Sequence, residues 1–256
     1  MRRRAGGRRL GLAAAAALLV LLAGCARGDD DPTVEGRLPT TEVTQPTTST
    51  TRATTTTTAP ACPPVTRATD IDGLVEQSAD VDGDHQADVV QTFPADGHVT
   101  LLVDLAAGGG ATVDIDANDA VAASLLGAEV LDASDGRDVL WLRVGAGAST
   151  TILGLYHLDG CSLEAATFEN GEPVELPIGG TVGTASGARC GSQIDREADL
   201  LVFESTLISG REYEIVTTEY RWQDGQLVRS PENAPTVRRS EDLTDVTGFR
   251  CGDLSL

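Results

Sequence analysis

The sequence predicts an all-β fold that is β-propeller-like: about three repeated four-stranded meanders and a C-terminal closing strand, behind a signal peptide and a disordered linker. Three observations predict it. Short apolar runs alternate with turn residues and do not follow a helical period. Asp-Gly pairs, which favour tight hairpin turns, stand between these runs. An acidic segment followed by an apolar run recurs about every 50 to 60 residues, a period typical of propeller blades or solenoids.

The first 24 residues have the plan of an export signal. Arginines at positions 2–4, 8 and 9 precede an apolar run of 14 residues, 10–23, which is shorter than the roughly 20 residues that a spanning helix needs. The run ends in Leu22-Ala23-Gly24-Cys25, which looks like a bacterial lipobox. That resemblance implies cleavage before Cys25 and a diacylglycerol on its sulfur, which would anchor the protein on the extracellular face of the cell membrane. An ordinary cleavage site and an uncleaved anchor are the alternatives.

The composition changes twice after the signal. Residues 25–66 join Cys25 to a Thr- and Pro-rich stretch with few apolar side chains. Burial there is too small to offset the ordering entropy, so this segment is expected to be a disordered tether, similar to an O-glycosylated stalk. Residues 67–256 have a globular composition and are long enough to bury one core. They are expected to form the all-β repeat domain.

Apolar runs and turn pairs predict the individual elements of this domain. Strands are expected at 89–93, 99–105, 139–144, 151–158, 200–203 and 213–222. Hairpin turns are expected at Asp96-Gly97, Asp159-Gly160 and Asp224-Gly225. The Ala-rich segment 118–126 is the best helix candidate.

Three segments of the domain align with one another. Asp84, Asp135 and Asp195 each stand a few residues before a further aspartate and an apolar run, and they are 51 and 60 residues apart. The turn segments 156–163 and 220–227 also align, as do 187–191 and 248–252. Each unit is therefore expected to contain a strand, an acidic loop and about three more strands. The last strand, at about 247–253, has no unit of its own and is expected to pair with strands from the start of the domain.

The acidic loop of the first unit has the composition of a cation site. Aspartates occupy positions 80, 82, 84 and 88, with Gly83 between them, and oxygen donors at this spacing suit calcium. The loop resembles the calcium loops of FG-GAP and VCBS repeats, the blades of integrin-α-type β-propellers. The resemblance implies a structural calcium held by one backbone carbonyl and four carboxylates: Gln86, Asp80, Asp82, Asp84 and Asp88.

Two features limit this resemblance. His85 stands where the family has Gly, although His tolerates the left-handed conformation better than most residues. The three copies cover residues 72–256, but in the second copy Val139 takes the last ligand position, and in the third Gly191 and Gln193 replace the first two acids. Both are expected to be turns without metal.

An EF-hand is excluded as an interpretation of the first loop, because it needs Gly and Glu where this chain has His85 and Gln91. A solvated acidic turn without a cation is the alternative. The whole chain also looks like tethered actinobacterial lipoproteins that carry such repeats.

Four cysteines remain after Cys25, and an even number in an exported protein predicts two disulfides with three possible pairings. Cys190 and Cys251 occupy equivalent positions in segments that align, so this pair is favoured, which leaves Cys62 to pair with Cys161. Zinc is disfavoured because no Cys-x-x-Cys pair is present.

The charge of the chain excludes one class of partner. Five of the 19 basic residues lie in the signal, so 14 remain against 39 acidic ones, a balance of −25. A phosphate backbone would be repelled, and no nucleic acid is expected to bind.

No catalytic constellation stands out. The three histidines are isolated from any nucleophile, and His98 and His157 are expected to be exposed strand residues. Asp114 and Asp116 form an acidic pair of the kind that glycosidases use. The sequence therefore predicts a membrane-anchored, extracellular, non-catalytic module that binds an envelope polysaccharide or a protein. The alternatives are a secreted cell-envelope hydrolase with unrecognised acidic residues and a structural lipoprotein with no specific ligand.

Overall fold

The computed structural model describes residues 62–116, 123–132, 134, 136–191, 199–230 and 234–256. The signal, Cys25, most of the tether, and the loop residues Asp135, Gln193 and Asp195 lie outside the described residues. All described residues belong to one compact unit.

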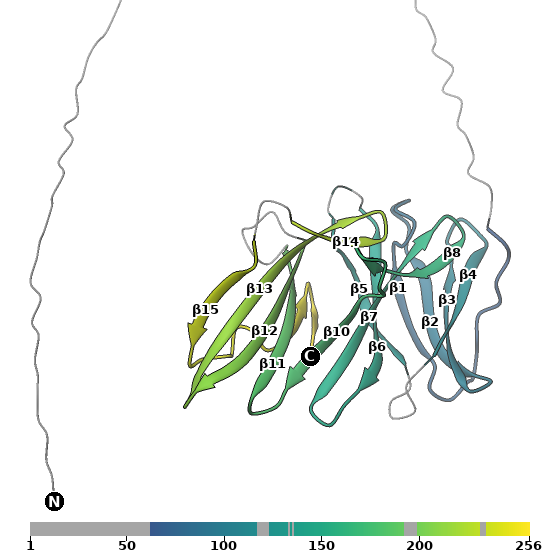
Figure 1. Cartoon of the computed structure of the whole chain (residues 1–256). Helices are drawn as coiled ribbons and strands as arrows, with labels where there is room; N and C mark the ends of the chain where they lie inside the picture. Colours follow the sequence, from purple (N-terminus) through teal and green to yellow (C-terminus); the bar gives the residue numbers. More distant parts are fainter. Residues whose placement is uncertain (1–61, 117–122, 133, 135, 192–198, 231–233) are drawn as a thin grey trace, which may run out of the picture. The chain divides into compact units, whose positions relative to one another are not determined.

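The first meander is a four-stranded antiparallel sheet in the order β1-β2-β3-β4 (Figure 1). Its strands are β1 (Val75–Ala79), β2 (Asp88–Ala95), β3 (His98–Asp104) and β4 (Gly110–Ile115). Asp96 and Gly97 connect β2 to β3 as the two central turn residues, with φ of 48° and 86°. Positive φ at both positions fits the right-handed twist of a hairpin, as the Asp-Gly pair predicts.

The other thirteen strands form one continuous sheet that is mostly antiparallel. They are β5 (Ser124–Val130), β6 (Asp138–Ala146), β7 (Thr150–Asp159), β8 (Ser162–Ala165), β9 (Thr167–Phe168), β10 (Glu175–Gly180), β11 (Thr184–Cys190), β12 (Leu200–Ser209), β13 (Glu212–Gln223), β14 (Gln226–Arg229), β15 (Thr236–Ser240), β16 (Gly248–Cys251) and β17 (Leu254–Ser255). The first sheet contacts this one through β1 against β5 and β4 against β8.

The expected unit of one strand, a loop and three further strands occurs three times, as β1–β4, β5–β8 and β11–β14. The expected propeller-like arrangement is only partly present, because the described strands form no closed propeller. The reason lies in β10, which pairs with β7 on one side and with β11 on the other. Its hydrogen bonds merge the second and third units into one sheet, whereas propeller blades are separate sheets.

The last strand does not join the start of the domain, so that expectation was wrong. β16 lies parallel to β11, with Gly248 opposite Gly187 and Arg250 opposite Arg189. It therefore pairs with the segment that it resembles in sequence. The chain end does approach the second unit: the backbone N–H of Asp253 donates to Oε1 of Glu129 at 3.0 Å.

The described part of the helix candidate is also different from the prediction, because Ser124–Val130 form strand β5. Ala123 and Leu125 are 5 % exposed and pack in a core cluster with Leu140 and Leu142 of β6. Pairing with β6 and burial of Leu125 outweigh the helix propensity of the alanines, which is a weak local preference.

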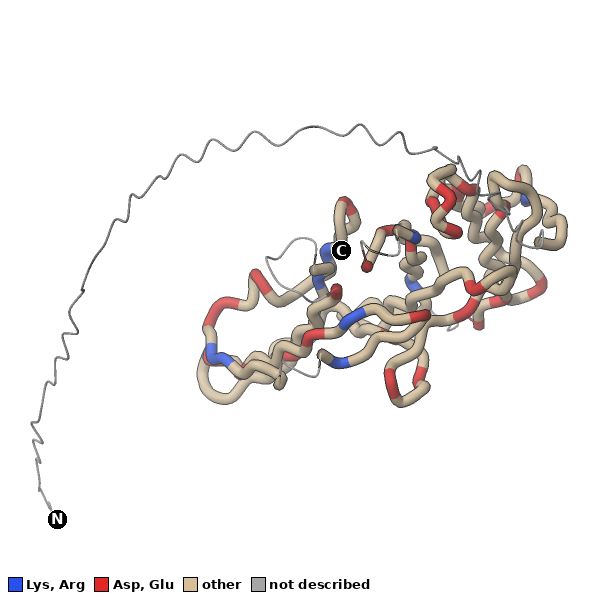
Figure 2. Tube along the Cα trace, turned by 90° about the horizontal axis from the view of Figure 1, so that it is seen from above, with Lys and Arg blue, Asp and Glu red and all other residues tan. Residues whose placement is uncertain are grey.

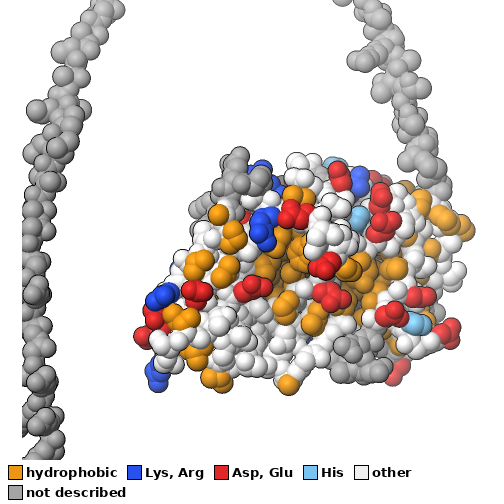
Figure 3. Space-filling view, in the orientation of Figure 1, with side chains coloured by type: hydrophobic (Ala, Val, Ile, Leu, Met, Phe, Trp, Pro, Cys, Tyr) orange, Lys and Arg blue, Asp and Glu red, His pale blue; other side chains and the backbone are white. Residues whose placement is uncertain are grey.

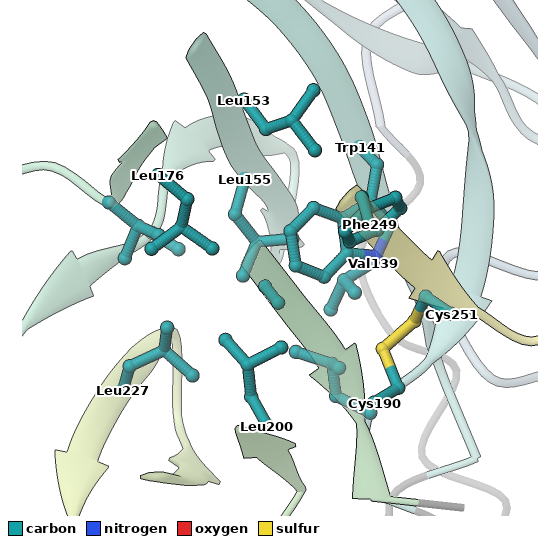
Figure 4. Packing of buried hydrophobic residues seen from close by; sticks show 14 of the residues in the cluster. Val139, Trp141, Leu153, Leu155, Leu176, Cys190, Leu200, Leu227, Phe249 and Cys251 are labelled. Carbon is teal, nitrogen blue, oxygen red and sulfur yellow. A yellow bond between two sulfur atoms is a disulfide. The ribbon is translucent and has the colours of Figure 1, made fainter. Parts of the chain in front are cut away.

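Two large cores hold the domain together. One lies among the first sheet, β5 and β6, with Leu101 and Val103 fully buried. The other lies within the second sheet, where the Trp141 and Phe249 rings are 4.7 Å apart (Figure 4). Figure 4 also shows the Cys190–Cys251 disulfide at the edge of this core. The second core joins β6 to the C-terminal strand β16.

Candidate functional site

The acidic loop connects β1 to β2 and is held by its own carboxylates. The Asp80 carboxylate accepts hydrogen bonds from the backbone N–H groups of Gly83 and His85, at 2.9 Å each. Gly83 and His85 both have positive φ, 77° and 66°. His85 therefore adopts the left-handed conformation, which His tolerates better than most residues. The resulting turn brings the carboxylates on its flanks together.

Three of the predicted ligands converge. Oxygen atoms of Asp80, Asp82 and Asp88 lie within 4.8 Å of one another, and among the described residues this is the one group of three side chains placed to hold a metal ion. Asp84 is not in the group: its carboxylate accepts hydrogen bonds from the backbone N–H and the side-chain amide of Gln86, both at 2.7 Å. Carboxylate oxygens at this separation suit a hard divalent cation.

Asp88 forms the buried end of this group. It is 1 % exposed, and its carboxylate accepts hydrogen bonds from the backbone N–H of Val81 at 3.0 Å and of Ala106 at 2.8 Å. Burial raises the pKa of Asp88, and the negative charges of Asp82 and Asp84 raise it further, while the two N–H groups oppose both effects. A bound cation would favour the ionised carboxylate.

Each of the other two units has a carboxylate in the place of Asp88. Asp138 begins β6 as Asp88 begins β2, so Asp138, and not Val139, takes the corresponding place. Its carboxylate accepts the backbone N–H of Asp80 at 2.8 Å, and its own N–H donates to the Asp80 carbonyl at 2.8 Å. In the third unit Asp199 accepts the backbone N–H of Trp222 at 2.7 Å. The aspartate that follows Asp135 and Asp195 in the aligned segments was the available sequence signal, although the ligand assignment had placed Val139 at this position.

The second acidic loop has a different local structure. The Asp132 carboxylate accepts the backbone N–H of Ser134 at 2.8 Å, and hydrogen bonds from Ser134 lower the pKa of Asp132. This is a self-contained Asx turn. The described part of the loop is therefore a turn, as expected, and does not gather carboxylates as the first loop does.

A polar cavity of about 260 Å³ lies beside the first loop. Its lining comes from all three units and consists of Val81, Arg137, Asp138, Val139, His157, Leu158, Asp159, Trp222, Asp224 and Gly225. The His157 and Trp222 rings meet edge to face with centroids 5.5 Å apart. Burial lowers the pKa of His157. The positive charge of Arg137 lowers this pKa further, whereas the negative charge of Asp159 is among the influences that raise it.

His157 was expected to be an exposed strand residue, but it is half-buried against the β13–β14 turn. A Cβ on Gly225 would lie 2.3 Å from His157 Nε2, so the imidazole occupies the space above this glycine. The aligned segments 156–163 and 220–227 gave a sequence signal that two equivalent turns exist. Nothing in that alignment indicated that the turns would meet.

The acidic pair of the hydrolase hypothesis lies elsewhere. Asp114 and Asp116 line a second cavity, of about 230 Å³, together with Tyr156 and Glu175. Burial raises the pKa of Tyr156, and the charges of Glu175 and Asp116 add to the effect. His98 Nδ1 lies 3.0 Å from Asp116 Oδ1. The carboxylates thus surround a phenol that retains its proton at neutral pH.

Both disulfides have the pairing favoured from the sequence. Cys62 is bonded to Cys161, with Cα atoms 5.3 Å apart, and Cys190 to Cys251, with Cα atoms 4.7 Å apart. Residues just after Cys62, assigned to the tether, are fastened as well: the Pro63 carbonyl accepts the N–H of Gly110 at 2.8 Å. Disulfides form in oxidising compartments, which indicates an extracytoplasmic protein. In the described part of the chain, no helix has both the length and the apolar character needed to cross a bilayer.

The described surface is rich in acidic side chains. Asp and Glu occur along much of the described chain, and Arg is less frequent (Figure 2). On the face shown in Figure 3, acidic side chains are interspersed with apolar side chains.

Comparisons with known proteins found no matching family model, no matching curated protein and no matching solved structure.

Proposed function

We propose that this protein is a lipoprotein anchored through Cys25 to the outer face of the cell membrane, where its β-repeat domain acts as a non-catalytic binding module. The repeats are FG-GAP/VCBS-like units, and the first holds a structural calcium ion. The observation that carries the proposal is the convergence of Asp80, Asp82 and Asp88 within 4.8 Å. The plan of one strand, an acidic loop and three strands in each unit supports it, as do the two disulfides.

Calcium is the ion that the donor set favours. All donors are oxygens, and two loop residues with positive φ allow the chain to fold back around an ion. Calcium accepts six to eight oxygens in flexible geometry, whereas the softer metals prefer nitrogen or sulfur. Three carboxylates leave room for waters and a backbone carbonyl such as that of Gln86. The expected role of the ion is to fix the loop between β1 and β2.

The lipid anchor has its own test. Metabolic labelling with a fatty acid is expected to label the wild type, and a Cys25→Ala variant is expected to lose the label and leave the membrane fraction. Retention of Cys25→Ala in the membrane, or a wild type without label, would reject the anchor and leave the other parts of the proposal standing.

The binding function is tested with isolated cell envelopes. The full chain carrying Cys25→Ala, which has no lipid to hold it, is expected to co-sediment with envelopes in calcium. It is expected to do so less in a chelator or with the additional change Asp82→Asn. Retention that survives protease treatment of the envelopes would identify polysaccharide as the ligand, and its loss would identify protein. If the full chain fails to co-sediment under every condition, the binding function is rejected and a spacing role is favoured.

The same assay addresses the hydrolase alternative, which the cavity around Asp114, Asp116 and Glu175 favours. A binding module is expected to release no new reducing ends from envelope polysaccharide. Release that disappears in Asp116→Asn would instead establish catalysis by this acidic group.

A further inference from the structure

The cavity beside the first acidic loop is assembled by all three units. Val81 comes from the first loop, Arg137 from the end of the second loop, His157 from β7, and Trp222 and Asp224 from the end of β13 and its turn. In repeat folds, binding sites commonly form where loops of successive units meet. This cavity is therefore placed where segments of all three units meet.

The cavity has an apolar floor. Val81, Val139, Leu158 and Trp222 are between 1 % and 7 % exposed. The floor is also fixed in shape, because the His157 ring stands edge to face against Trp222 and occupies the space above Gly225. A flat C–H surface of a ligand would find a complementary surface there.

The rim, in contrast, is polar and carries both charges. Asp159, Asp224 and Arg137 are exposed at its edge, and Asp138 is half-buried. Each carboxylate accepts several hydrogen bonds and Arg137 donates them. A ligand with many hydroxyl groups would satisfy such a rim. A negatively charged ligand would meet three carboxylates and one guanidinium, and would be disfavoured.

We propose that this cavity binds one sugar ring without negative charge, with a C–H face of the ring on Trp222 and His157 and its hydroxyls donating to Asp138, Asp159 and Asp224. The volume fits this size of ligand, since about 260 Å³ is slightly below the 300–1,000 Å³ or so of pockets for drug-sized molecules. The inference rests on the proposed binding function and names its ligand class and its site.

The two tryptophans of the chain make the test specific. Trp222 lines the cavity, whereas Trp141 is fully buried against Phe249 and serves as an internal reference. The full chain labelled with 5-fluorotryptophan is titrated with glucose, N-acetylglucosamine, glucosamine and glucuronic acid. The ¹⁹F signal of Trp222 is expected to shift with the first three sugars, while glucuronic acid binds at least about tenfold more weakly because of its charge. The Trp141 signal is expected to stay in place.

A matched pair of variants locates the effect. Asp224 and Asp96 both occupy the first central position of an Asp-Gly turn, with φ of 46° and 48°, and Asn tolerates this conformation. Asp224→Asn is expected to weaken sugar binding about tenfold, through loss of a charge-assisted hydrogen bond. Asp96→Asn, in the first unit, is expected to change nothing. An unchanged Trp141 signal shows in each case that the fold is intact.

Three results would overturn the proposal: a Trp222 signal that no sugar moves, equal binding by both variants, or strongest binding of glucuronic acid. If sugars fail while envelopes still retain the full chain, the module binds elsewhere and only this site is rejected. If sugars bind but envelopes do not retain the chain, the cavity stands and the proposed envelope ligand is wrong.

Discussion

The first unit and the two later units share one plan but are stabilised differently. Strands β1–β4 form a separate sheet, and its loop gathers three carboxylates. The second and third units are merged by β10 into one sheet, which the parallel strand β16 and the Cys190–Cys251 disulfide reinforce. The unit that lacks these connections is the one with the complete acidic loop.

The difference separates two roles for the acidic residues. A carboxylate at the start of the second strand, or directly before it, is present in every unit, as Asp88, Asp138 and Asp199, and each accepts at least one backbone N–H. A buried N–H without a partner is costly, so this position is structural in all three units. The additional carboxylates Asp80 and Asp82 converge with Asp88 in the first loop, and no other group of this kind occurs among the described residues.

Removing a disulfide is expected to have the largest effect. Replacing Cys190 and Cys251, 61 residues apart, with alanine should reduce the free energy of unfolding by about 4 kcal/mol in the chain-entropy model. Both cysteines are buried in the second core, so lost packing adds to this. Urea unfolding measures the loss, and hydrogen exchange should show faster exchange in β11 and β16.

The other disulfide provides the contrast. Replacing Cys62 and Cys161, 99 residues apart, should cost a similar amount, about 5 kcal/mol, but the faster exchange should fall in β3, β4 and β8. The comparison between units fails if both pairs of substitutions loosen the same strands.

Gly225→Ala is expected to be destabilising by about 2–4 kcal/mol, because the new Cβ would be strained at φ 82° and would meet the His157 ring. Gly97→Ala in the first unit is the control. It has almost the same φ, 86°, and open space around its Cβ, so it should cost only about 1–2 kcal/mol. Thermal or urea unfolding of both variants measures the difference. Equal losses would show that the His157 contact contributes nothing.

The bond between units is tested at Asp138. Asp138→Ala removes the acceptor for the Asp80 N–H and should cost about 1–3 kcal/mol. Asp138→Asn retains an acceptor oxygen and should cost much less. Urea unfolding in a chelator separates this effect from ion binding. A loss of the same size in both variants would mean that the carboxylate charge, and not the hydrogen bond, holds the loop.

A smaller effect is expected from the titration of Asp199. Burial raises its pKa above the ordinary 3.8, so the folded state binds the proton more tightly than the unfolded state. The stability that Asp199 contributes is therefore full at low pH and falls as the pH rises from 3.8 through the raised value. Asp199→Asn lacks this decline, so the stability of the variant relative to wild type should rise from about pH 4 to about pH 7. A constant difference over this range would refute the raised pKa.

The six strands and three Asp-Gly hairpin turns expected from local patterns are present, because alternating apolar residues and Asp-Gly turns act over a few residues. The strand expected at 139–144, for example, is part of β6, and its apolar residues Leu140 and Leu142 are fully buried. The alignment of 187–191 with 248–252 also had a direct physical meaning, since these segments became the parallel pair β11 and β16. That alignment also identified Cys190 and Cys251 as partners.

Long-range pairing was beyond local patterns. Nothing in the residues of β10 indicates that it would pair on both sides and prevent separate blades, because backbone hydrogen bonds carry no side-chain signature. The acidic loop was recognisable from its spacing, yet Asp84 is turned toward Gln86 and away from the group. The cavity around His157 and Trp222 depends on two turns about 65 residues apart in sequence, and such a meeting is decided by tertiary packing.

Calorimetric titration of the full chain with calcium tests most directly whether the first unit, and only that unit, holds an ion. We expect uptake of one calcium ion per chain, abolished by Asp82→Asn and unchanged by Asp132→Asn in the second loop, where the carboxylate is engaged by Ser134. No uptake by the wild type, or uptake that Asp82→Asn retains and Asp132→Asn loses, would contradict it.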